Sequence, residues 1–339
     1  MTTLLVFILS FIISDTPPYP TELKVDEIKI KGITMVAPPR EFPTDPMDPI
    51  ASINANYVAL VPYGFSRLGL PTVYYDTPRQ WWGERKEGIV ASIKYAHQNG
   101  LQVMLKPQVF IPRGWVGEMA FKQESEWREW EESYRTYILD FARIAAEENI
   151  ALFCIGTEYK IAAVEREKFW RELINEVRTI YPGKITYSSN WDSYKKIPFW
   201  DAVDFIGLSA YFPLTRIKTP SISLLKKEWK PIVKKLKKFS SRHKRQIVFT
   251  EYGYLSVDYC ADKNWELEQR IAALEVNETA QANAYQALLE SFGNERFWSG
   301  GFLWKWFPNM SGHEGYPHKD YTPQGKIAEE TIRSLYRKI

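Results

Sequence analysis

Two short apolar segments of the chain end in the same way, with a glutamate followed by a tyrosine. Residues 247–250 are β-branched, aromatic and uncharged and lead into Glu251, and the apolar residues 151–156 lead through Thr157 into Glu158. Runs of this kind predict strands that are buried on both faces. A carboxylate at the end of such a strand is unfavourable unless it is paired or used. Each glutamate could simply cap a helix or pair with an arginine, but the matching contexts favour two carboxylates that face one cleft.

Apolar and amphipathic segments alternate along the rest of the chain. Segments expected to be strands occupy residues 32–37, 57–63, 102–106, 151–156, 185–188, 205–209, 247–250 and 301–306. Segments expected to be helices occupy residues 87–99, 124–149, 165–181, 226–245, 277–292 and 322–337, and residues 47–55 are expected to be helical or irregular. Eight strands that alternate with helices predict an α/β fold, a single (β/α)8 TIM barrel. Because the strands of such a barrel all end on one side, Glu158 and Glu251 are expected to lie close together.

A doubly wound open sheet is the main alternative architecture. Such a sheet usually places a glycine-rich turn after its first strand, where the turn binds a nucleotide phosphate. Here Pro38 and Pro39 follow the first expected strand, and the sequence contains neither a GxGxxG pattern nor a P-loop. The barrel is therefore favoured, and no nucleotide is expected as a ligand.

The charge and the cysteine content argue against several classes of partner. The net charge of +3 is too small to indicate nucleic-acid binding. The basic run at residues 226–245 has helical spacing and is expected to be a solvated outer face, not a site for nucleic acid or membrane. Cys154 and Cys260 give no disulfide framework, and no spacing of Cys and His suggests a metal site. We expect no metal and no cofactor, and the sequence leaves the oligomeric state open.

Aromatic side chains make up 15% of the residues, and the chain contains 13 tryptophans. A tryptophan offers a flat apolar face and one N–H donor, which suits the C–H face of a sugar ring beside its hydroxyl groups. The tryptophans near expected strand ends are Trp81, Trp82, Trp115, Trp191, Trp304 and Trp306. The alternative for such residues is packing in the core, which is the expectation for Trp127, Trp130 and Trp170 inside expected helices.

The N-terminus carries an apolar run that is unlike the rest of the chain. Residues 4–13 are apolar, too few to span a bilayer comfortably, and a Ser-Asp-Thr-Pro-Pro segment ends the run. No Lys or Arg precedes it, and no clear small-x-small cleavage site follows. We predict an export segment at residues 1–20, with an uncleaved anchor as the alternative, and a catalytic domain at residues 21–339. The protein is accordingly expected to be periplasmic, at the cell surface or secreted.

From about Gly32 to the C-terminus, the chain resembles the retaining glycoside hydrolases of clan A. More narrowly, it is similar to glycoside hydrolase family 113, the β-1,4-mannanases. The motifs that carry the resemblance follow consecutive expected strands, in the order Leu105-Lys106-Pro107, Ile155-Gly156-Thr157-Glu158, Ser189-Asn190-Trp191, Phe249-Thr250-Glu251-Tyr252-Gly253-Tyr254, Gly301-Phe302-Leu303-Trp304 and Tyr321-Thr322-Pro323-Gln324-Gly325-Lys326. Much of clan A has Asn where this chain has Thr157, so the contact of that Asn with the sugar 2-hydroxyl is in question, and Asn190 is the candidate to replace it.

The resemblance implies a role for each carboxylate. Glu251 would attack the anomeric carbon, and Glu158 would protonate the leaving oxygen and then act as base for water. Retention requires carboxyl groups roughly 5–5.5 Å apart, against about 6.5–9.5 Å for inversion. Burial and the charge of Glu251 are expected to raise the pKa of Glu158.

Further residues near the strand ends are candidates for substrate binding. Tyr211 is the expected donor to Glu251, and Trp304 is the expected platform beneath the sugar at the cleavage point, with barrel packing as the alternative. Lys106 and Asn190 are candidate contacts to hydroxyl groups. The tryptophans expected to bind substrate at other positions, with structural packing as the alternative for the first three, are Trp81, Trp82, Trp115 and Trp191.

The predicted activity is endo-acting hydrolysis of β-1,4-mannosidic bonds in mannan or glucomannan. One alternative keeps the fold and the carboxylates but acts on another β-glycan, as a β-glucanase does. A second is a non-catalytic carbohydrate-binding barrel, and a third is an exported solute-binding protein with two lobes, against which the count of eight strands argues. The sequence does not separate mannan from another β-glycan, endo from exo action, or polymer from oligosaccharide.

Overall fold

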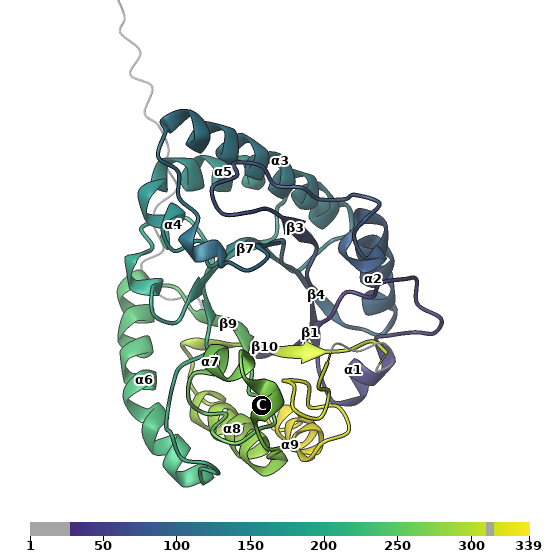
Figure 1. Cartoon of the computed structure of the whole chain (residues 1–339), viewed down its shortest axis with the longest axis vertical. Helices are drawn as coiled ribbons and strands as arrows, with labels where there is room; N and C mark the ends of the chain where they lie inside the picture. The colour runs from purple at the N-terminus through teal and green to yellow at the C-terminus, as the bar shows by residue number, and fades with distance from the viewer. Residues whose placement is uncertain (1–27, 310–314) are drawn as a thin grey trace, which may run out of the picture.

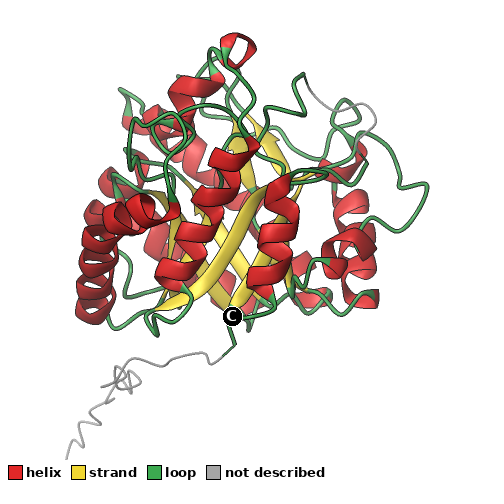
Figure 2. Ribbon diagram, turned by 90° about the horizontal axis from the view of Figure 1, so that it is seen from below, coloured by secondary structure: helices red, strands yellow, loops and turns green. Residues whose placement is uncertain are grey.

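The computed structural model describes residues 28–309 and 315–339, which fold around a closed barrel of parallel strands (Figures 1 and 2). The strands follow one another around the barrel in the order β1-β10-β9-β8-β7-β6-β4-β2. Their bounds are β1 Ile30–Met35, β2 Tyr57–Leu60, β4 Gln102–Leu105, β6 Leu152–Thr157, β7 Lys184–Asn190, β8 Phe205–Ser209, β9 Ile247–Tyr252 and β10 Trp298–Trp306. The predicted (β/α)8 barrel is confirmed.

Helices form the outer layer around the strands, as Figure 1 shows. Their bounds are α1 Asp48–Ser52, α2 Lys86–Gln98, α3 Glu124–Glu147, α4 Ala162–Glu165, α5 Glu167–Ile180, α6 Ile222–His243, α7 Asn264–Glu268, α8 Glu278–Phe292 and α9 Ile327–Tyr336. In α5 the buried residues are Phe169, Trp170, Leu173, Ile174 and Val177. These positions repeat every three to four residues and form one apolar stripe, so the helix packs that stripe against the barrel and leaves its charged face to water.

Two strands outside the barrel were not predicted. The expected strand at residues 57–63 stops at Leu60, and the chain resumes as β3 (Tyr63–Phe65), which pairs in parallel with β5 (Gln108–Phe110). Pro62 and Pro107 stand just before these two strands. A proline has no N–H to donate to a strand ladder, so the barrel pairing ends there and the chains continue as a separate two-stranded sheet.

The barrel interior changes from apolar to polar along its axis. At the N-terminal end it is filled by Ile30, Ala59, Met104, Leu152, Phe205, Val248 and Phe302, which form one buried cluster. Toward the C-terminal ends of the strands the buried side chains include Lys106, Ser188, Ser209, Thr250 and Glu251. Buried polar groups need hydrogen-bond partners, and several of them lie together here. Because the active sites of such barrels lie at the C-terminal ends of the strands, this mouth of the barrel is the candidate site.

The expected export segment at residues 1–20 lies outside the described residues. None of the helices at residues 28–309 and 315–339 combines the length and the apolar character that crossing a bilayer requires.

Candidate active site

Strand register brings the two glutamates to the same end of the barrel. Glu251 lies within β9, and Glu158 directly follows β6. Ser209 at the end of β8 is paired with Glu251 on one side and with Asn190 on the other. The side chain of Ser209 also hydrogen-bonds Glu158, whose pKa is raised by burial and next by the negative charge of Glu251. The predicted meeting of two distant carboxylates therefore occurs, at the mouth where the strands end.

Glu251 is buried, with 6% of its surface exposed, and its two carboxylate oxygens face different donors. The Lys106 ammonium is fully buried and forms an ion pair with Oε1. The Tyr211 hydroxyl donates to Oε2 at 3.0 Å. Burial, and next the charge of Glu251, hold the pKa of Tyr211 well above its usual value near 10, so the phenol keeps the proton it donates. Both oxygens of Glu251 are thus satisfied in the way that a buried charged carboxylate requires.

Glu158 has an environment of the opposite kind. Burial, and next the charge of Glu251, raise its pKa above the usual value near 4.5. Two hydrogen bonds lower the pKa again in part, from Trp115 Nε1 to Oε2 at 2.9 Å and from Ser209. Glu158 is therefore driven toward its protonated form, beside a second carboxyl group that a lysine and a tyrosine hold, which is an arrangement suited to acid–base chemistry.

The backbone at Glu158 is in the left-handed region, with φ of 59°. Such a conformation is uncommon for a residue with a side chain, and it is found where the surrounding structure imposes it. Here the Glu158 N–H donates to the Ser188 carbonyl at 2.7 Å. The strained turn ends β6 and directs the glutamate into the mouth of the barrel.

Hydroxyl groups lie beneath the two carboxylates. Ser188 Oγ is 2.6 Å from Thr250 Oγ1 and 3.1 Å from Ser209 Oγ, and all three side chains are fully buried. These hydroxyls bond to one another across β7, β8 and β9, so each of them has a hydrogen-bond partner in the interior. The same bonds hold the Ser209 side chain in position to bond to Glu158.

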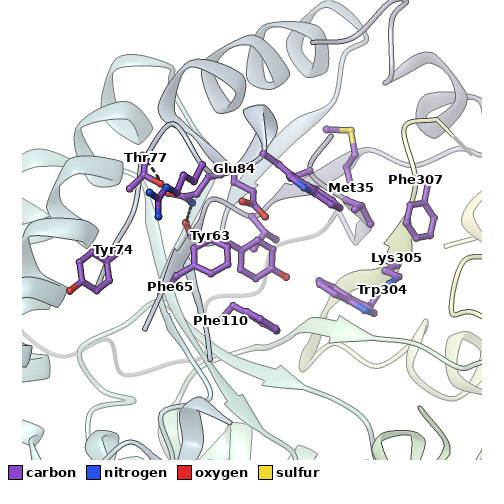
Figure 3. A pocket seen from close by; sticks show the side chains of 16 residues that line it. Met35, Tyr63, Phe65, Tyr74, Thr77, Glu84, Phe110, Trp304, Lys305 and Phe307 are labelled. Carbon is purple, nitrogen blue, oxygen red and sulfur yellow. Dashed lines mark hydrogen bonds between the residues drawn. The ribbon is translucent and has the colours of Figure 1, made fainter. Parts of the chain in front are cut away.

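An aromatic groove opens beside the carboxylates, over β1, β2 and β10 (Figure 3). Its volume is about 580 Å³, and Figure 3 shows Trp304 facing Tyr63, Phe65 and Phe110 across it. The other lining residues are Met35, Val36, Ala37, Val61, Tyr74, Thr77, Arg79, Gln80, Trp81, Glu84, Lys305 and Phe307. Aromatic walls interrupted by a few charged groups suit a sugar chain, which presents C–H faces and hydroxyl edges in alternation.

Some of the expected substrate-binding residues line the aromatic groove, and others are buried or packed elsewhere. Trp304 and Trp81 line the aromatic groove, and the Lys106 ammonium lies 5.7 Å from the centre of the Trp304 ring. Lys106 was expected to contact a hydroxyl group, but it is fully buried and its ion-pair partner is Glu251. Trp82 packs edge-to-face on Phe42, with ring centres 5.4 Å apart, which corresponds to the packing alternative.

Asn190, Trp191 and Trp115 lie away from that groove. Trp115 contacts Glu158 directly. Asn190 is half-buried at the end of β7, where its Oδ1 accepts the Trp191 backbone N–H at 2.9 Å. Thr157, where much of clan A has Asn, is only 2% exposed.

Three further residues near the mouth escaped the sequence analysis. Glu84 is buried in the wall of the aromatic groove. Trp265 and Glu268 lie three residues apart on α7, Trp265 stacking on Trp191 and Glu268 hydrogen-bonding Tyr321. Their only local signal is a tryptophan and acidic residues within a long loop after an expected strand, which is too common a pattern to predict a site.

Within residues 28–309 and 315–339, no group of three or more His, Cys, Asp and Glu side chains is arranged to hold a metal ion. The mouth of the barrel presents carboxyl, hydroxyl, amine and indole groups.

Comparisons with known proteins point to one family. The model of Glycoside Hydrolase Family 113 matches residues 43–326. A family 113 β-mannanase from Alicyclobacillus acidocaldarius, solved in complex with ManMIm, superposes with a TM-score of 0.77 at 28% identity, covering 92% of this chain and 98% of that one. A second family 113 β-1,4-mannanase superposes with a TM-score of 0.76 at 27% identity, covering 92% of this chain and 100% of that one.

A more distant match supports the fold alone. A β-glucuronidase from Ruminococcus gnavus superposes with a TM-score of 0.62 at 13% identity, covering 91% of this chain and 50% of that one. A comparison with curated protein sequences gave no match.

Proposed function

The chain belongs to glycoside hydrolase family 113, and we propose that it is a retaining, endo-acting β-1,4-mannanase of mannan or glucomannan. The observation that carries the proposal is the pair of carboxyl groups with opposed environments. Glu251 faces a lysine and a tyrosine donor, whereas the pKa of Glu158 is raised by burial and by the charge of Glu251. The mannose preference is supported by two family members of 27–28% identity that are described as β-mannanases.

The reaction has two displacements. In the first, a Glu251 oxygen forms a bond to the anomeric carbon while the glycosidic C–O bond breaks, and Glu158 gives its proton to the departing oxygen. In the second, Glu158, now a carboxylate, takes a proton from water as the water oxygen attacks the same carbon and Glu251 departs. The raised pKa of Glu158 suits the first step because the residue must begin protonated near neutral pH.

The neighbours of Glu251 have defined tasks in this scheme. Lys106 and Tyr211 hold the carboxylate in one orientation through its two oxygens. Trp304 lies beside Lys106 and is the proposed platform for the sugar that becomes attached to Glu251. Such positioning reduces the entropic part of the barrier.

The proposal is tested by product analysis on β-1,4-linked manno- and gluco-oligosaccharides, with the wild type and Glu251→Ala side by side. We expect manno-oligosaccharide cleavage by the wild type, products that first appear with the β anomeric configuration in proton NMR, and no cleavage by the variant. Cleavage of the gluco-series alone would overturn the substrate assignment. First products of α configuration would overturn the retaining mechanism, and binding without hydrolysis would favour a carbohydrate-binding barrel.

The roles of the two glutamates are separated by a substrate with a good leaving group. Glu158→Gln should lose activity on an oligosaccharide by at least about 100-fold, because the leaving sugar oxygen needs a proton, but it should still react with a mannobiosyl fluoride. Glu251→Gln should lose activity on both substrates. The reverse pattern would exchange the two assignments.

A further inference from the structure

Residues 321–326 carry part of the family resemblance, yet none of them has a task in the proposed reaction. They form a loop directly before α9, and we call this loop the clip segment. Tyr321, Thr322, Pro323 and Lys326 are buried, although connecting loops usually run over the surface. A loop with four of its six residues buried is held by its neighbours, so its contacts indicate what it does.

The side chain of Gln324 pairs with the backbone of Phe307, the first residue after β10. The Phe307 N–H donates to Oε1 at 2.7 Å, and Nε2 donates to the Phe307 carbonyl at 2.9 Å. The Thr322 hydroxyl donates to the same Oε1 at 2.8 Å. A side-chain amide offers an acceptor and a donor side by side, as the backbone of a neighbouring strand does. Because the pairing of β10 with β1 ends at Trp306, Gln324 continues that pairing by one residue.

Gln324 thereby fixes the end of β10 that forms one wall of the aromatic groove. Trp304, Lys305 and Phe307 line the groove, and Figure 3 shows them together on one side of it. The Lys305 ammonium lies 5.1 Å from the centre of the Phe307 ring and 3.5 Å from Asp320 Oδ2. Because only two residues separate Trp304 from Phe307, a shift of the Phe307 backbone also moves Trp304.

Two other residues join the clip segment to the side of the mouth that carries Glu251. The Lys326 ammonium, in a residue with only 9% of its surface exposed, donates to Ser256 Oγ at 2.8 Å, in the loop after β9. The ring of Tyr321 packs against that of Tyr211, with centres 6.1 Å apart, and Tyr211 donates to Glu251. One short segment therefore contacts both the support of the proposed nucleophile and the end of β10.

The distance between these two supports matters for the proposed reaction. A sugar held by Trp304 reacts only when its anomeric carbon lies within reach of Glu251, and a misplacement of about 1 Å can lower a rate by about 100-fold. We propose that the clip segment sets the position of Trp304 relative to Glu251, with Gln324 as the positioning residue; the inference rests on the proposed function. Gln324 acts through the end of β10 and not by contact with the sugar.

The inference is tested by a cycle of single and double variants, Gln324→Met and Trp304→Ala, on β-mannobiosyl fluoride. Methionine is similar in length to glutamine but cannot form either bond to Phe307, and fluoride departs without a proton, which keeps weak variants measurable. With Trp304 present, Gln324→Met should lower kcat/KM about 10-fold, mainly through kcat. In the Trp304→Ala background it should cost less than about 2-fold, because the side chain that it positions is gone.

The cycle separates positioning from a loss of folded protein, which would lower kcat/KM by the same factor in both backgrounds. If Gln324→Met does not fold, Gln324→Glu takes its place in the cycle, since it keeps the acceptor for the Phe307 N–H but loses the donor. Equal losses in both backgrounds, or no loss with Trp304 present, would overturn the inference.

Gln246→Met is the matched control. Gln246 is a buried glutamine whose Nε2 donates to the Arg296 carbonyl at 2.8 Å, but it precedes β9 at the opposite end of the barrel. The control should lower the melting temperature and leave kcat/KM unchanged where the protein is folded, and a loss equal to that of Gln324→Met would count against positioning. If the wild type cleaves only gluco-substrates, the mannan assignment fails, whereas the same cycle on β-cellobiosyl fluoride still decides the role of Gln324.

Discussion

Lys106 and Glu251 form a fully enclosed ion pair that joins β4 to β9 across the barrel. Lys106 has no exposed surface and Glu251 has only 6%. A buried pair of this kind contributes little net stability, but removal of one partner leaves an unpaired charge in a medium of low polarity. The pair is therefore best understood as a way to keep Glu251, the proposed nucleophile, in place, not as a device that stabilises the fold.

Replacing the lysine alone should be more damaging than replacing both partners. We expect Lys106→Met to destabilise the protein by about 3–5 kcal/mol, because Glu251 would remain buried without its cation. The double variant Lys106→Met, Glu251→Gln should recover a large part of that loss. Urea unfolding of the three proteins at one pH measures the effect, and a double variant less stable than Lys106→Met would contradict it.

Trp115 gives Glu158 a hydrogen bond that favours the charged form of the carboxyl group. The indole N–H donates to Oε2 at 2.9 Å, and this bond lowers a pKa that burial and Glu251 raise. The pKa of Glu158 therefore results from opposed effects, and single substitutions should move it in a direction that can be stated in advance.

Trp115→Phe should move the alkaline limb of the pH dependence of kcat/KM to higher pH. Without the N–H donor the charged carboxylate is less stable, the pKa of Glu158 rises, and the acid stays protonated to a higher pH. The measurement is a pH profile on an oligosaccharide, with Trp81→Phe as a matched control whose limb should not move. A limb that moves to lower pH in Trp115→Phe would show that Glu158 is not the group reported.

At the scale of elements, the predicted strands agree with the structure where a strand is buried on both faces. The expected strand at residues 205–209 coincides with β8, and the other seven barrel strands lie within a few residues of expectation. Parallel strands covered on both faces appear in a sequence as short apolar runs, so they are easily found. The small β3–β5 sheet was missed because Tyr63–Phe65 and Gln108–Phe110 are too short to show a period.

The part of the site that lies on loops could not be predicted in the same way. Glu158 and Glu251 were found because they interrupt apolar runs at strand ends. The pairing of Lys106 with Glu251 joins residues that are far apart in the chain, and no local pattern encodes it. The position of Trp265 depends on the course of the long connection between β9 and α8, which becomes visible only after folding.

The contact between β9 and β10 depends on Gly253, two residues after Glu251. A methyl group added to Gly253 would lie 2.4 Å from the carbonyl oxygen of Trp304, which belongs to the backbone and cannot rotate away. Gly253→Ala should therefore displace Trp304, destabilise the protein by about 1–3 kcal/mol and lower kcat/KM. Thermal unfolding and kinetics measure both effects, and an unchanged melting temperature with full activity would show that β10 adjusts freely.

At the scale of the whole molecule, the last helix secures the place where the barrel closes. The strands β1 and β10 meet there, and α9 packs outside them with Ala328, Ile332, Leu335 and Tyr336 buried. The hydroxyl of Tyr336 donates to the Gly32 carbonyl at 2.9 Å and lies 2.7 Å from the hydroxyl of Tyr252. The Tyr336 side chain thus joins β1 to β9, the strand that carries Glu251.

Tyr336→Phe should test how strongly this closure holds the molecule together. The substitution keeps the ring but removes the hydrogen bond from Tyr336 to the Gly32 carbonyl and leaves the buried Tyr252 hydroxyl without the partner it has in the wild type, at a cost of roughly 1–3 kcal/mol for the orphaned hydroxyl. Tyr252→Phe removes only the contact between the two hydroxyls and should cost less. In the double variant no hydroxyl is left without its partner, so the double loss should be smaller than the sum of the single losses. The free energy of unfolding of all four proteins is measured in urea. If the losses of stability in the two single variants add up to the loss in the double variant, the two tyrosines act independently and α9 does not couple β1 to β9 through this contact.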